Sequence, residues 1–257
     1  MCPGTIPKRG DKVKYFLGEQ SNGAAKLQDA YPRGIGRCFV TRPIDPFVNE
    51  PWFLDNGVFP AWNRPDENGD TRTPDRDYSD VYANFESRFG RVAELGAEGR
   101  GPDFMVIPDR PGEASSLMVS TDWLLYYIEY VKNTFDPDGT VPLYLAVQDG
   151  FDAEDVEHLL ASSVGHAIGG LFLGGTDEFK ATTIRSWRAL ATRFGIKLHY
   201  GRCTQTRLQE ALDAGCDSAD SSHPLRLGPN RWARFLEVFD AVVGHPPLAP
   251  WITQEAA

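Results

Sequence analysis

The residue types that could do chemistry gather in five short segments, each at the end of an apolar stretch. These segments are Leu54-Asp55-Asn56-Gly57, Ile107-Pro108-Asp109, Val147-Gln148-Asp149-Gly150, Gly169-Gly170-Leu171 and Asp217-Ser218-Ala219-Asp220. If the apolar stretches are parallel strands, the polar groups at their carboxyl ends converge on one site. The order of the segments therefore predicts an active site assembled from distant parts of the chain.

Three carboxylates, those of Asp55, Asp109 and Asp220, would share that site. Neighbouring carboxylates shift one another's pKa values, so one can act as a nucleophile, another as an acid or base, and a third as a ligand-binding group. This division of roles suits cleavage of a glycosidic bond by double displacement, in which one carboxylate attacks the anomeric carbon and another manages the proton of the leaving group. The simpler alternative for each aspartate is a helix cap or a turn residue.

Gln148 and the Gly169-Gly170 pair suit a flat, polar ligand. A side-chain amide offers a donor and an acceptor together, and glycines let a ligand approach backbone N–H groups closely. A Gly-Gly pair in a strand is also a common packing device. The sequence leaves both interpretations of the glycines open.

Strands and helices alternate along the chain. The predicted strands are Lys14–Leu17, Trp52–Leu54, Phe104–Ile107, Leu143–Val147, Ile168–Leu173, Lys197–Tyr200 and Cys216–Ala219, with Cys38–Val40 as a weaker eighth. Apolar residues at helical spacing predict helices at Val81, Phe85, Phe89, Val92 and Leu95, at Trp123, Ile128 and Val131, and at Val156, Leu159 and Leu160 behind Asp152. Further helices are predicted over residues 180–194 before Gly195, 206–214 before Gly215, and 230–243.

Seven or eight such strand-helix units in 257 residues predict an α/β chain folded as a (β/α)8 barrel, a TIM barrel, in one domain over residues 1–257. Such a barrel commonly needs about 250 residues. An open doubly wound sheet is the alternative, but no G-x-G-x-x-G dinucleotide loop follows the first strand. The stretch over residues 60–80 is rich in Pro, Asp, Asn, Gly and Arg, which predicts a long loop over the barrel mouth.

The composition argues against a membrane protein. Hydrophobic residues make up 41% of the chain, and no apolar run reaches the ~20 residues of a transmembrane helix. The first residues lack the apolar core of a secretory signal, which predicts a cytoplasmic protein. The cysteines, at positions Cys2, Cys38, Cys203 and Cys216, form no C-x-x-C pair, which predicts free thiols and no structural zinc site.

Charge is unevenly distributed along the chain. A net charge of −10 argues against binding to nucleic acid, which normally needs a basic surface. Yet the segment from Phe179 to Gln209 holds seven basic residues and no acidic one. That segment is either an electrostatic footprint for phosphates or the solvated outer face of a helix.

Taken in order, the five segments resemble those of the guanine transglycosylase family, barrel enzymes that exchange guanine in a nucleic acid for a 7-deazaguanine base. The matches to the family are Asp55-Asn56-Gly57-Val58-Phe59 for Asp-Ser-Gly-Gly-Phe, Phe104–Asp109 for V-M-V-F-D, Leu145–Gly150 for G-I-V-Q-G-G, Gly169–Gly174 for G-G-L-A-V-G, and Gly215–Asp220 for G-x-D-x-x-D. A strand similar to the family's K-P-H-Y, Lys197–Tyr200, precedes the last of them. The resemblance covers about residues 55–224.

The resemblance implies a role for each matched residue. Asp220 would be the nucleophile that attacks C1′ of a guanosine or deoxyguanosine, and Asp55 the acid and base that serves the leaving and entering bases. The base would be bound by Asp109, Gln148, Gly169, Gly170 and Leu171, with the Gly170 N–H on O6. No metal or other cofactor would be required. Arginines flank the nucleophile segment and are candidate phosphate contacts: Arg202, Arg207, Arg226, Arg231 and Arg234.

The chain departs from the family at the zinc module. The tRNA enzymes carry a C-x-C-x-x-C…His subdomain after the nucleophile, but here no cysteine follows Cys216, and Ser221-Ser222-His223-Pro224 replaces a common Thr-Arg. This departure favours the short relatives encoded with 7-deazapurine DNA-modification genes in phages and bacteria. DNA is therefore the expected partner and the cyano-bearing base preQ0 the expected incoming base, and the target base must be flipped out or unpaired. A homodimer or a partner protein stays open.

Three alternatives accompany this hypothesis. A tRNA-directed transglycosylase is the closest one. A non-catalytic subunit that binds a base or a nucleic acid would keep the fold, although the presence of both Asp55 and Asp220 argues against it. A barrel glycoside hydrolase would use the same carboxylates on a sugar, with Trp52 or Trp62 as a stacking platform. His223 and Asp217 are each either participants or capping and hydrogen-bonding residues.

Overall fold

The structure is a computed structural model that describes residues 13–18, 24–40, 46, 50–72, 76–113, 115–132 and 141–243. Its parallel strands close into a barrel in chain order, and the last strand pairs with the first. The strands are β1 (Lys14–Gly18), β2 (Gly36–Phe39), β3 (Trp52–Leu54), β4 (Phe104–Val106), β5 (Leu143–Val147), β6 (Ile168–Leu173), β7 (Lys197–Tyr200) and β8 (Ser218–Ser221). The predicted (β/α)8 barrel is confirmed.

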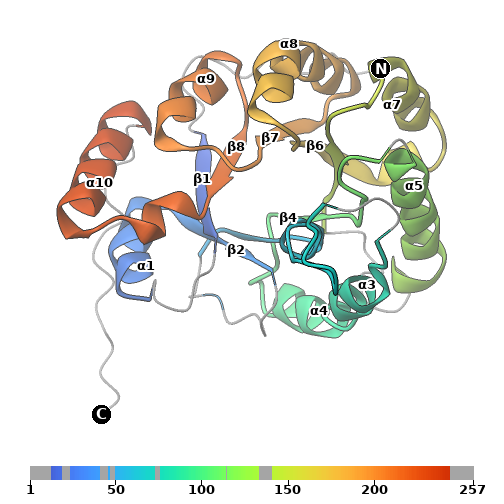
Figure 1. The fold of residues 1–257 in the computed structure, drawn as a ribbon, viewed down its shortest axis with the longest axis horizontal. Helices are drawn as coiled ribbons and strands as arrows, with labels where there is room; N and C mark the ends of the chain where they lie inside the picture. The colour runs from blue at the N-terminus through green and yellow to red at the C-terminus, as the bar shows by residue number, and fades with distance from the viewer. Residues whose placement is uncertain are drawn as a thin grey trace.

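Helices surround the barrel, and in Figure 1 the ring closes where α10 in red lies beside α1 in blue. They are α1 (Ala24–Ala30), α2 (Val58–Trp62), α3 (Ser79–Glu86), α4 (Phe89–Ala97), α5 (Ser116–Tyr126), α7 (Ala153–Ala161), α8 (Asp177–Phe194), α9 (Leu208–Asp213) and α10 (Pro229–Val243). Single turns add η1 (Tyr31–Arg33), η2 (Tyr127–Val131), η3 (Gly165–Ala167), η4 (Gln205–Arg207) and η5 (His223–Arg226). Among the described residues, no helix has the length and apolar character that crossing a bilayer demands.

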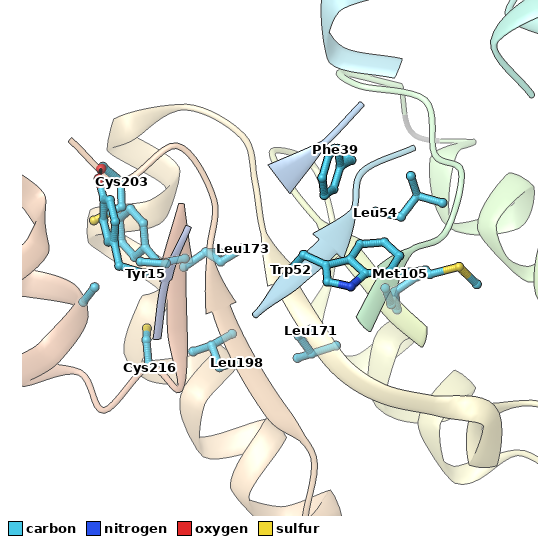
Figure 2. Close-up of a cluster of buried hydrophobic side chains, with 14 of the residues drawn as sticks. Tyr15, Phe39, Trp52, Leu54, Met105, Leu171, Leu173, Leu198, Cys203 and Cys216 are labelled. Carbon is cyan, nitrogen blue, oxygen red and sulfur yellow. Dashed lines mark hydrogen bonds between the residues drawn. The ribbon is translucent and has the colours of Figure 1, made fainter. Parts of the chain in front are cut away.

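Strand side chains that point outward form a continuous apolar layer against the helices. Trp52 and Met105 belong to this layer on β3 and β4, and Leu171 and Leu198 on β6 and β7 (Figure 2). The Tyr15 hydroxyl group also lies in it and donates a hydrogen bond of 2.9 Å to the carbonyl oxygen of Cys203. This layer follows from the alternation of the strands, because successive side chains point to opposite faces.

Aromatic side chains that point inward fill the interior of the barrel. The rings of Phe104 and Tyr144 stack with centroids 3.9 Å apart, and Phe53 stacks on Phe104 at 4.5 Å. Phe16 packs edge-on against Phe53 at 5.0 Å. Phe104 and Tyr144 lie at the start of β4 and β5, and Phe16 and Phe53 are the middle residues of β1 and β3. Side chains therefore fill the barrel interior, and a site is expected at the carboxyl ends of the strands.

The last strand begins two residues later than the sequence predicts. The predicted strand was Cys216–Ala219, whereas β8 spans Ser218–Ser221. Gly215 has a φ of 74° and continues the turn that ends α9, and the Cys216 N–H donates to the carbonyl oxygen of Ala211. Cys216 therefore belongs to the turn, and Asp220 lies inside the strand instead of beyond it.

The helical pattern from Val81 to Leu95 is divided between two helices, α3 and α4. The chain turns at Arg88, whose N–H donates to the carbonyl oxygen of Phe85, three residues earlier. The Arg88 guanidinium group also donates to the carbonyl oxygen of Val40. This contact joins distant segments of the chain, so the spacing of apolar residues from Val81 to Leu95 could not reveal it. The predicted loop over residues 60–80 begins with α2 and then runs to α3, with residues 73–75 outside the described part.

Candidate active site at the barrel mouth

The carboxyl ends of the strands bring four predicted site residues to one end of the barrel. Asp55 follows β3 directly, Asp109 lies just after β4, and Gln148 follows β5. Asp220 lies in β8, where its neighbour in register on β1 is Phe16. The charge of Asp220 acts on Asp55, and the charge of Asp55 acts on Asp109. The three carboxylates thus form one electrostatic unit.

Asp220 is held through one of its two carboxylate oxygens. His199 Nε2 lies 2.9 Å from Asp220 Oδ1, and the backbone N–H of Arg202 donates to the same oxygen at 3.1 Å. No side chain or backbone group among the described residues donates to Oδ2. Deeper in the barrel, His199 Nδ1 lies 2.8 Å from the Ser218 hydroxyl oxygen. Asp220 therefore has a fixed orientation and one oxygen that no described residue engages.

Asp55 has the environment of a carboxyl group that exchanges a proton near neutral pH. Burial raises the pKa of Asp55 to about 6, and the charge of Asp220 acts in the same direction. The Gly57 N–H, which donates to Asp55 Oδ1 at 3.0 Å, and the Arg88 guanidinium group oppose this shift. Gly57 adopts a φ of 78°, a left-handed conformation that suits glycine. A pKa in this range is suited to general acid-base catalysis.

Asp109 lies at the centre of a buried polar network. Its two oxygens accept hydrogen bonds from Asn56 Nδ2 at 2.8 Å and from Gln148 Nε2 at 3.1 Å. The Ser116 hydroxyl oxygen accepts a second bond from Gln148 Nε2 at 3.0 Å. Burial raises the pKa of Asp109 to about 7, the charge of Asp55 adds to this effect, and the Asn56 and Gln148 amide groups oppose it. The network therefore holds Asp109 and Gln148 against each other in a defined arrangement.

Three residues of the site were missed in the sequence. Asn56 accepts a bond from the Val58 N–H at 2.9 Å and donates to the Ile107 carbonyl oxygen at 2.9 Å, so it ties the end of β3 to the end of β4. An Asn between Asp and Gly is a signal for such a turn. His199 was also predictable, because its neighbours Leu198 and Tyr200 face outward. Ser116 has no local signal, since only the packing of α5 brings it to Gln148.

The segment Gly169-Gly170-Leu171 does not lie at the mouth, which corrects its expected place beside a bound base. It occupies the second to fourth positions of the six-residue strand β6, where Gly170 is paired in register with Tyr144. A Cβ atom on Gly170 would lie 2.5 Å from the Tyr144 ring, and one on Gly169 would lie 2.9 Å from Pro142 Cβ. The Leu171 side chain is fully buried in the outer layer. Close packing against Tyr144 and Pro142 therefore explains the glycines.

Asp149, which follows Gln148 in the third segment, has a structural role. Its carboxylate accepts hydrogen bonds of 2.6 Å from the N–H and from the hydroxyl group of Thr176. Thr176 in turn caps the first turn of α8, because its hydroxyl oxygen accepts from the Phe179 N–H at 3.2 Å. Asp149 is thus a turn residue that joins the ends of β5 and β6.

The candidate phosphate-binding arginines have different environments. Arg202 is exposed, adopts a φ of 54°, and places its guanidinium group 4.2 Å from the centre of the Phe59 ring. Arg207 forms an ion pair of 2.7 Å with Glu210. Arg226 is exposed in η5 and also has contacts within the protein. Of these three, Arg202 is the one in direct contact with the carboxylate site.

Most basic residues of the segment from Phe179 to Gln209 are paired with acidic ones elsewhere. These ion pairs join Lys180 to Asp177, Arg188 to Asp217, Arg193 to Glu157 and Arg207 to Glu210. The Lys180 amino group is also buried, and it donates to the carbonyl oxygen of Gly201 at 3.1 Å. The segment therefore offers much less free positive charge than its sequence suggests.

The residues that would support other interpretations lie away from the site or are covered. Trp52 points outward and donates to the Arg100 carbonyl oxygen at 2.8 Å, so it is no platform for a sugar. The Arg72 guanidinium group covers the Trp62 ring at 5.0 Å. Asp217 precedes β8 and accepts from the Leu198 N–H at 2.9 Å, as expected for a hydrogen-bonding residue.

His223 and the cysteines were the remaining candidates from the sequence. His223 is exposed at the start of η5, where its N–H donates to the Ser221 hydroxyl oxygen at 3.1 Å. Cys38, Cys203 and Cys216 are buried free thiols, as predicted, while Cys2 lies outside the described residues. Within the described ranges, no group of three or more His, Cys, Asp and Glu side chains is arranged to hold a metal ion.

Comparisons with known proteins find only distant likenesses. No family model matches the chain, and no curated protein matches it. Among solved structures, an HpcH/HpaI aldolase from Desulfitobacterium hafniense DCB-2 is similar over 93% of this chain and 96% of its own, with 10% identity and a TM-score of 0.49. A malate synthase from Haloferax volcanii is similar over 96% of this chain and 76% of its own, with 12% identity and a TM-score of 0.47. Neither likeness bears on the chemistry of this chain.

Proposed function

We propose that the protein is an enzyme that replaces guanine in DNA with a 7-deazaguanine base such as preQ0, through a covalent intermediate on Asp220. The observation that carries the proposal is the division of three neighbouring carboxylates into three environments. Asp220 is oriented by His199, Asp55 has a pKa of about 6, and Asp109 is bonded to Gln148. Double displacement at an N-glycosidic bond needs a nucleophile, an acid-base group and groups that bind the base.

In the first half-reaction, Asp220 Oδ2 attacks C1′ of the target deoxyguanosine. A bond forms between Oδ2 and C1′ while the bond between C1′ and N9 breaks, and its electron pair leaves with guanine. Asp55 in its protonated form transfers a proton to the departing base. Its raised pKa keeps part of the protein in this form near neutral pH.

In the second half-reaction, the incoming 7-deazaguanine takes the place of guanine. The Asp55 carboxylate removes the N9 proton of the incoming base, N9 attacks C1′, and the bond to Asp220 breaks. The protonated form of Asp55 is thereby restored, and no proton or electron is lost over the cycle. This reversal of roles is expected of one group that serves both steps.

The groups that would bind the base are those of the buried network. Asp109 and Gln148 offer a carboxyl group and a side-chain amide, which match the donors and acceptors on the edge of a guanine or a 7-deazaguanine. Because both bases share that edge, one pocket serves both half-reactions. Asn56 supports Asp109 through its hydrogen bond of 2.8 Å. The proposal assigns no contact with the base to Gly169, Gly170 or Leu171.

Incubation of the protein with labelled preQ0 and either guanine-containing DNA or tRNA tests the proposal. Incorporation into DNA is the expected result. Incorporation into tRNA alone would establish the tRNA-directed alternative. Binding of the base or the nucleic acid without incorporation into either would reject base exchange and favour a binding subunit.

Asp220→Asn should abolish both incorporation and the covalent adduct with the nucleic acid, because an amide oxygen is a poor nucleophile. Asp213→Asn is the matched control, since Asp213 is an exposed residue at the end of α9 and the substitution removes the same charge. The control should keep wild-type incorporation. A fully active Asp220→Asn variant would reject the assigned nucleophile.

A further inference from the structure

A buried chain of three polar side chains runs from the mouth into the barrel. It consists of Asp220, His199 and Ser218, with distances of 2.9 Å between Asp220 Oδ1 and His199 Nε2 and 2.8 Å between His199 Nδ1 and the Ser218 hydroxyl oxygen. The His199 side chain is 0% exposed, whereas that of Asp220 is 11% exposed. Only the carboxylate end of the chain therefore reaches the mouth.

The partners of His199 determine where its proton lies. A carboxylate oxygen only accepts hydrogen bonds, so Nε2 must carry the proton of the bond to Asp220. The Ser218 hydroxyl group supports this arrangement because it can donate to the lone pair of Nδ1. The tautomer with a bare Nε2 would instead place a lone pair against the Asp220 carboxylate.

Aromatic rings fix the plane of the His199 ring and keep a ligand away from it. Phe172 stacks on the ring at 4.7 Å, and Phe53 and Phe104 each lie at 5.1 Å. His199 thus has no path to a substrate atom and can influence the reaction only through Asp220.

We propose that His199 is a positioning residue that holds Oδ1 of Asp220 so that Oδ2 faces C1′ of the substrate. The inference rests on the proposed function, because it assigns Asp220 as the nucleophile. In the covalent intermediate Oδ1 is the carbonyl oxygen of the ester, and the donors His199 Nε2 and Arg202 N–H remain on it. They then stabilise the carboxylate that leaves in the second half-reaction.

Two substitutions of His199 separate positioning from packing. His199→Leu fills the space between the aromatic rings but provides no hydrogen-bond donor. His199→Gln restores an N–H group near the position of Nε2. We expect kcat of base exchange to fall roughly 10- to 100-fold in His199→Leu, the effect of losing a hydrogen bond to a charged group, with KM unchanged within about twofold. His199→Gln should recover most of this loss. Equal rates for folded His199→Leu and wild type, or a loss confined to KM, would overturn the proposal.

Nitrogen NMR of the imidazole ring gives a second readout that needs no activity. In the wild-type protein Nε2 of His199 should carry a proton, and Asp220→Ala should shift its resonance. A bare Nε2 would overturn the proposal even if exchange occurs. The NMR measurement also tests the role of His199 if His199→Leu does not fold. If the wild type exchanges bases in neither DNA nor tRNA, the proposed function fails, while the state of Nε2 still tests the contact with Asp220.

Discussion

At the scale of single residues, three aspartates of the same chemical type have different properties because their surroundings differ. Among the described residues, donors reach only one oxygen of Asp220. Asp55 accepts from the Gly57 N–H and is affected by the charge of Asp220, and two amide side chains donate to Asp109. Burial disfavours the charged form of a carboxyl group, and N–H donors favour it. The balance of these two effects at each aspartate leads to the following two predictions.

Asp55→Asn should lower the rate of covalent adduct formation by roughly 10²- to 10⁴-fold, the usual contribution of a general acid. In the wild type this rate should fall as the pH rises through about 6, because the protonated form of Asp55, whose pKa is about 6, is the acid. Rapid-quench trapping of the adduct across this range measures both effects. A pH step of the same size in the Asn variant would contradict the assignment.

Asp109 should make the folded state less stable as the pH rises. Its pKa is about 7 in the folded protein against an ordinary value of 3.8, so between these values the folded state binds more protons than the unfolded state. Stability from this residue is thus greatest at low pH and falls as the pH rises toward 7. Asp109→Asn removes this pH dependence. The difference in free energy of unfolding between the variant and wild type should therefore shift in favour of the variant by a few kcal/mol as the pH rises from about 5 to about 8.

Urea unfolding of both proteins at the two pH values checks this expectation. Asp213→Asn is the control for the loss of one exposed charge, and its difference from wild type should change little with pH. A constant difference between Asp109→Asn and wild type would show that Asp109 is ionised in both states.

At the scale of elements, the stacked rings inside the barrel, called here the aromatic plug, limit how deep in the barrel a site can lie. The plug consists of Phe16, Phe53, Phe104 and Tyr144. Phe104 and Tyr144 stack so closely that neither ring has room to move toward the other, and Gly170 of β6 packs against the Tyr144 ring. The candidate site is therefore built on strand ends and on the loops that follow them. His199 and Asp220 form the boundary between the plug and the mouth.

Gly170→Ala should destabilise the protein by about 1–3 kcal/mol, the usual result of overpacking a filled core. The new Cβ would lie 2.5 Å from the Tyr144 ring, which stacks on Phe104 and cannot yield. Gly96→Ala in α4 is the matched control, because nothing lies within 4 Å of its added Cβ. This control should be neutral or more stable by about 0.5–1 kcal/mol. Equal urea midpoints for the two variants would contradict the packing role of Gly170.

At the scale of the whole molecule, electrostatics would limit how the protein binds the DNA of the proposed reaction. The net charge is −10, and most basic residues between Phe179 and Gln209 pair with acidic groups. Binding through many phosphate contacts is therefore not expected. A flipped or unpaired base held at the mouth would supply more of the affinity than the backbone does.

The salt dependence of DNA binding should accordingly be shallow, with a slope of log K against log salt of about −3 or less steep. Arg202→Gln should reduce the magnitude of the slope by about one if this exposed side chain contacts a phosphate. Arg193→Gln is the control, because Arg193 pairs with Glu157 on the outer face of α8. Fluorescence anisotropy over a salt series measures the slopes, and a wild-type slope of about −6 would contradict the expectation.

The sequence predicted the strands well, because alternating apolar residues and turn residues are local signals. The bounds of β3, β5, β6 and β7 were predicted to the residue. The start of β8 was wrong because Cys216 continues the hydrogen bonding of α9, which apolar character does not reveal. Gly170 was expected beside a bound base but packs against Tyr144. Tyr144 belongs to another strand, so the residues near Gly170 in the sequence do not reveal this contact.

The sequence by itself determined the barrel and the strand ends that carry carboxylates, because both depend on the order and spacing of nearby residues. Only the tertiary structure decided which oxygen of Asp220 is engaged, why the pKa values of Asp55 and Asp109 rise, and which basic residues are already paired. Those properties depend on burial and on distances between residues far apart in the chain. Electrostatic and hydrogen-bond energies change steeply with such distances, and no local pattern encodes them.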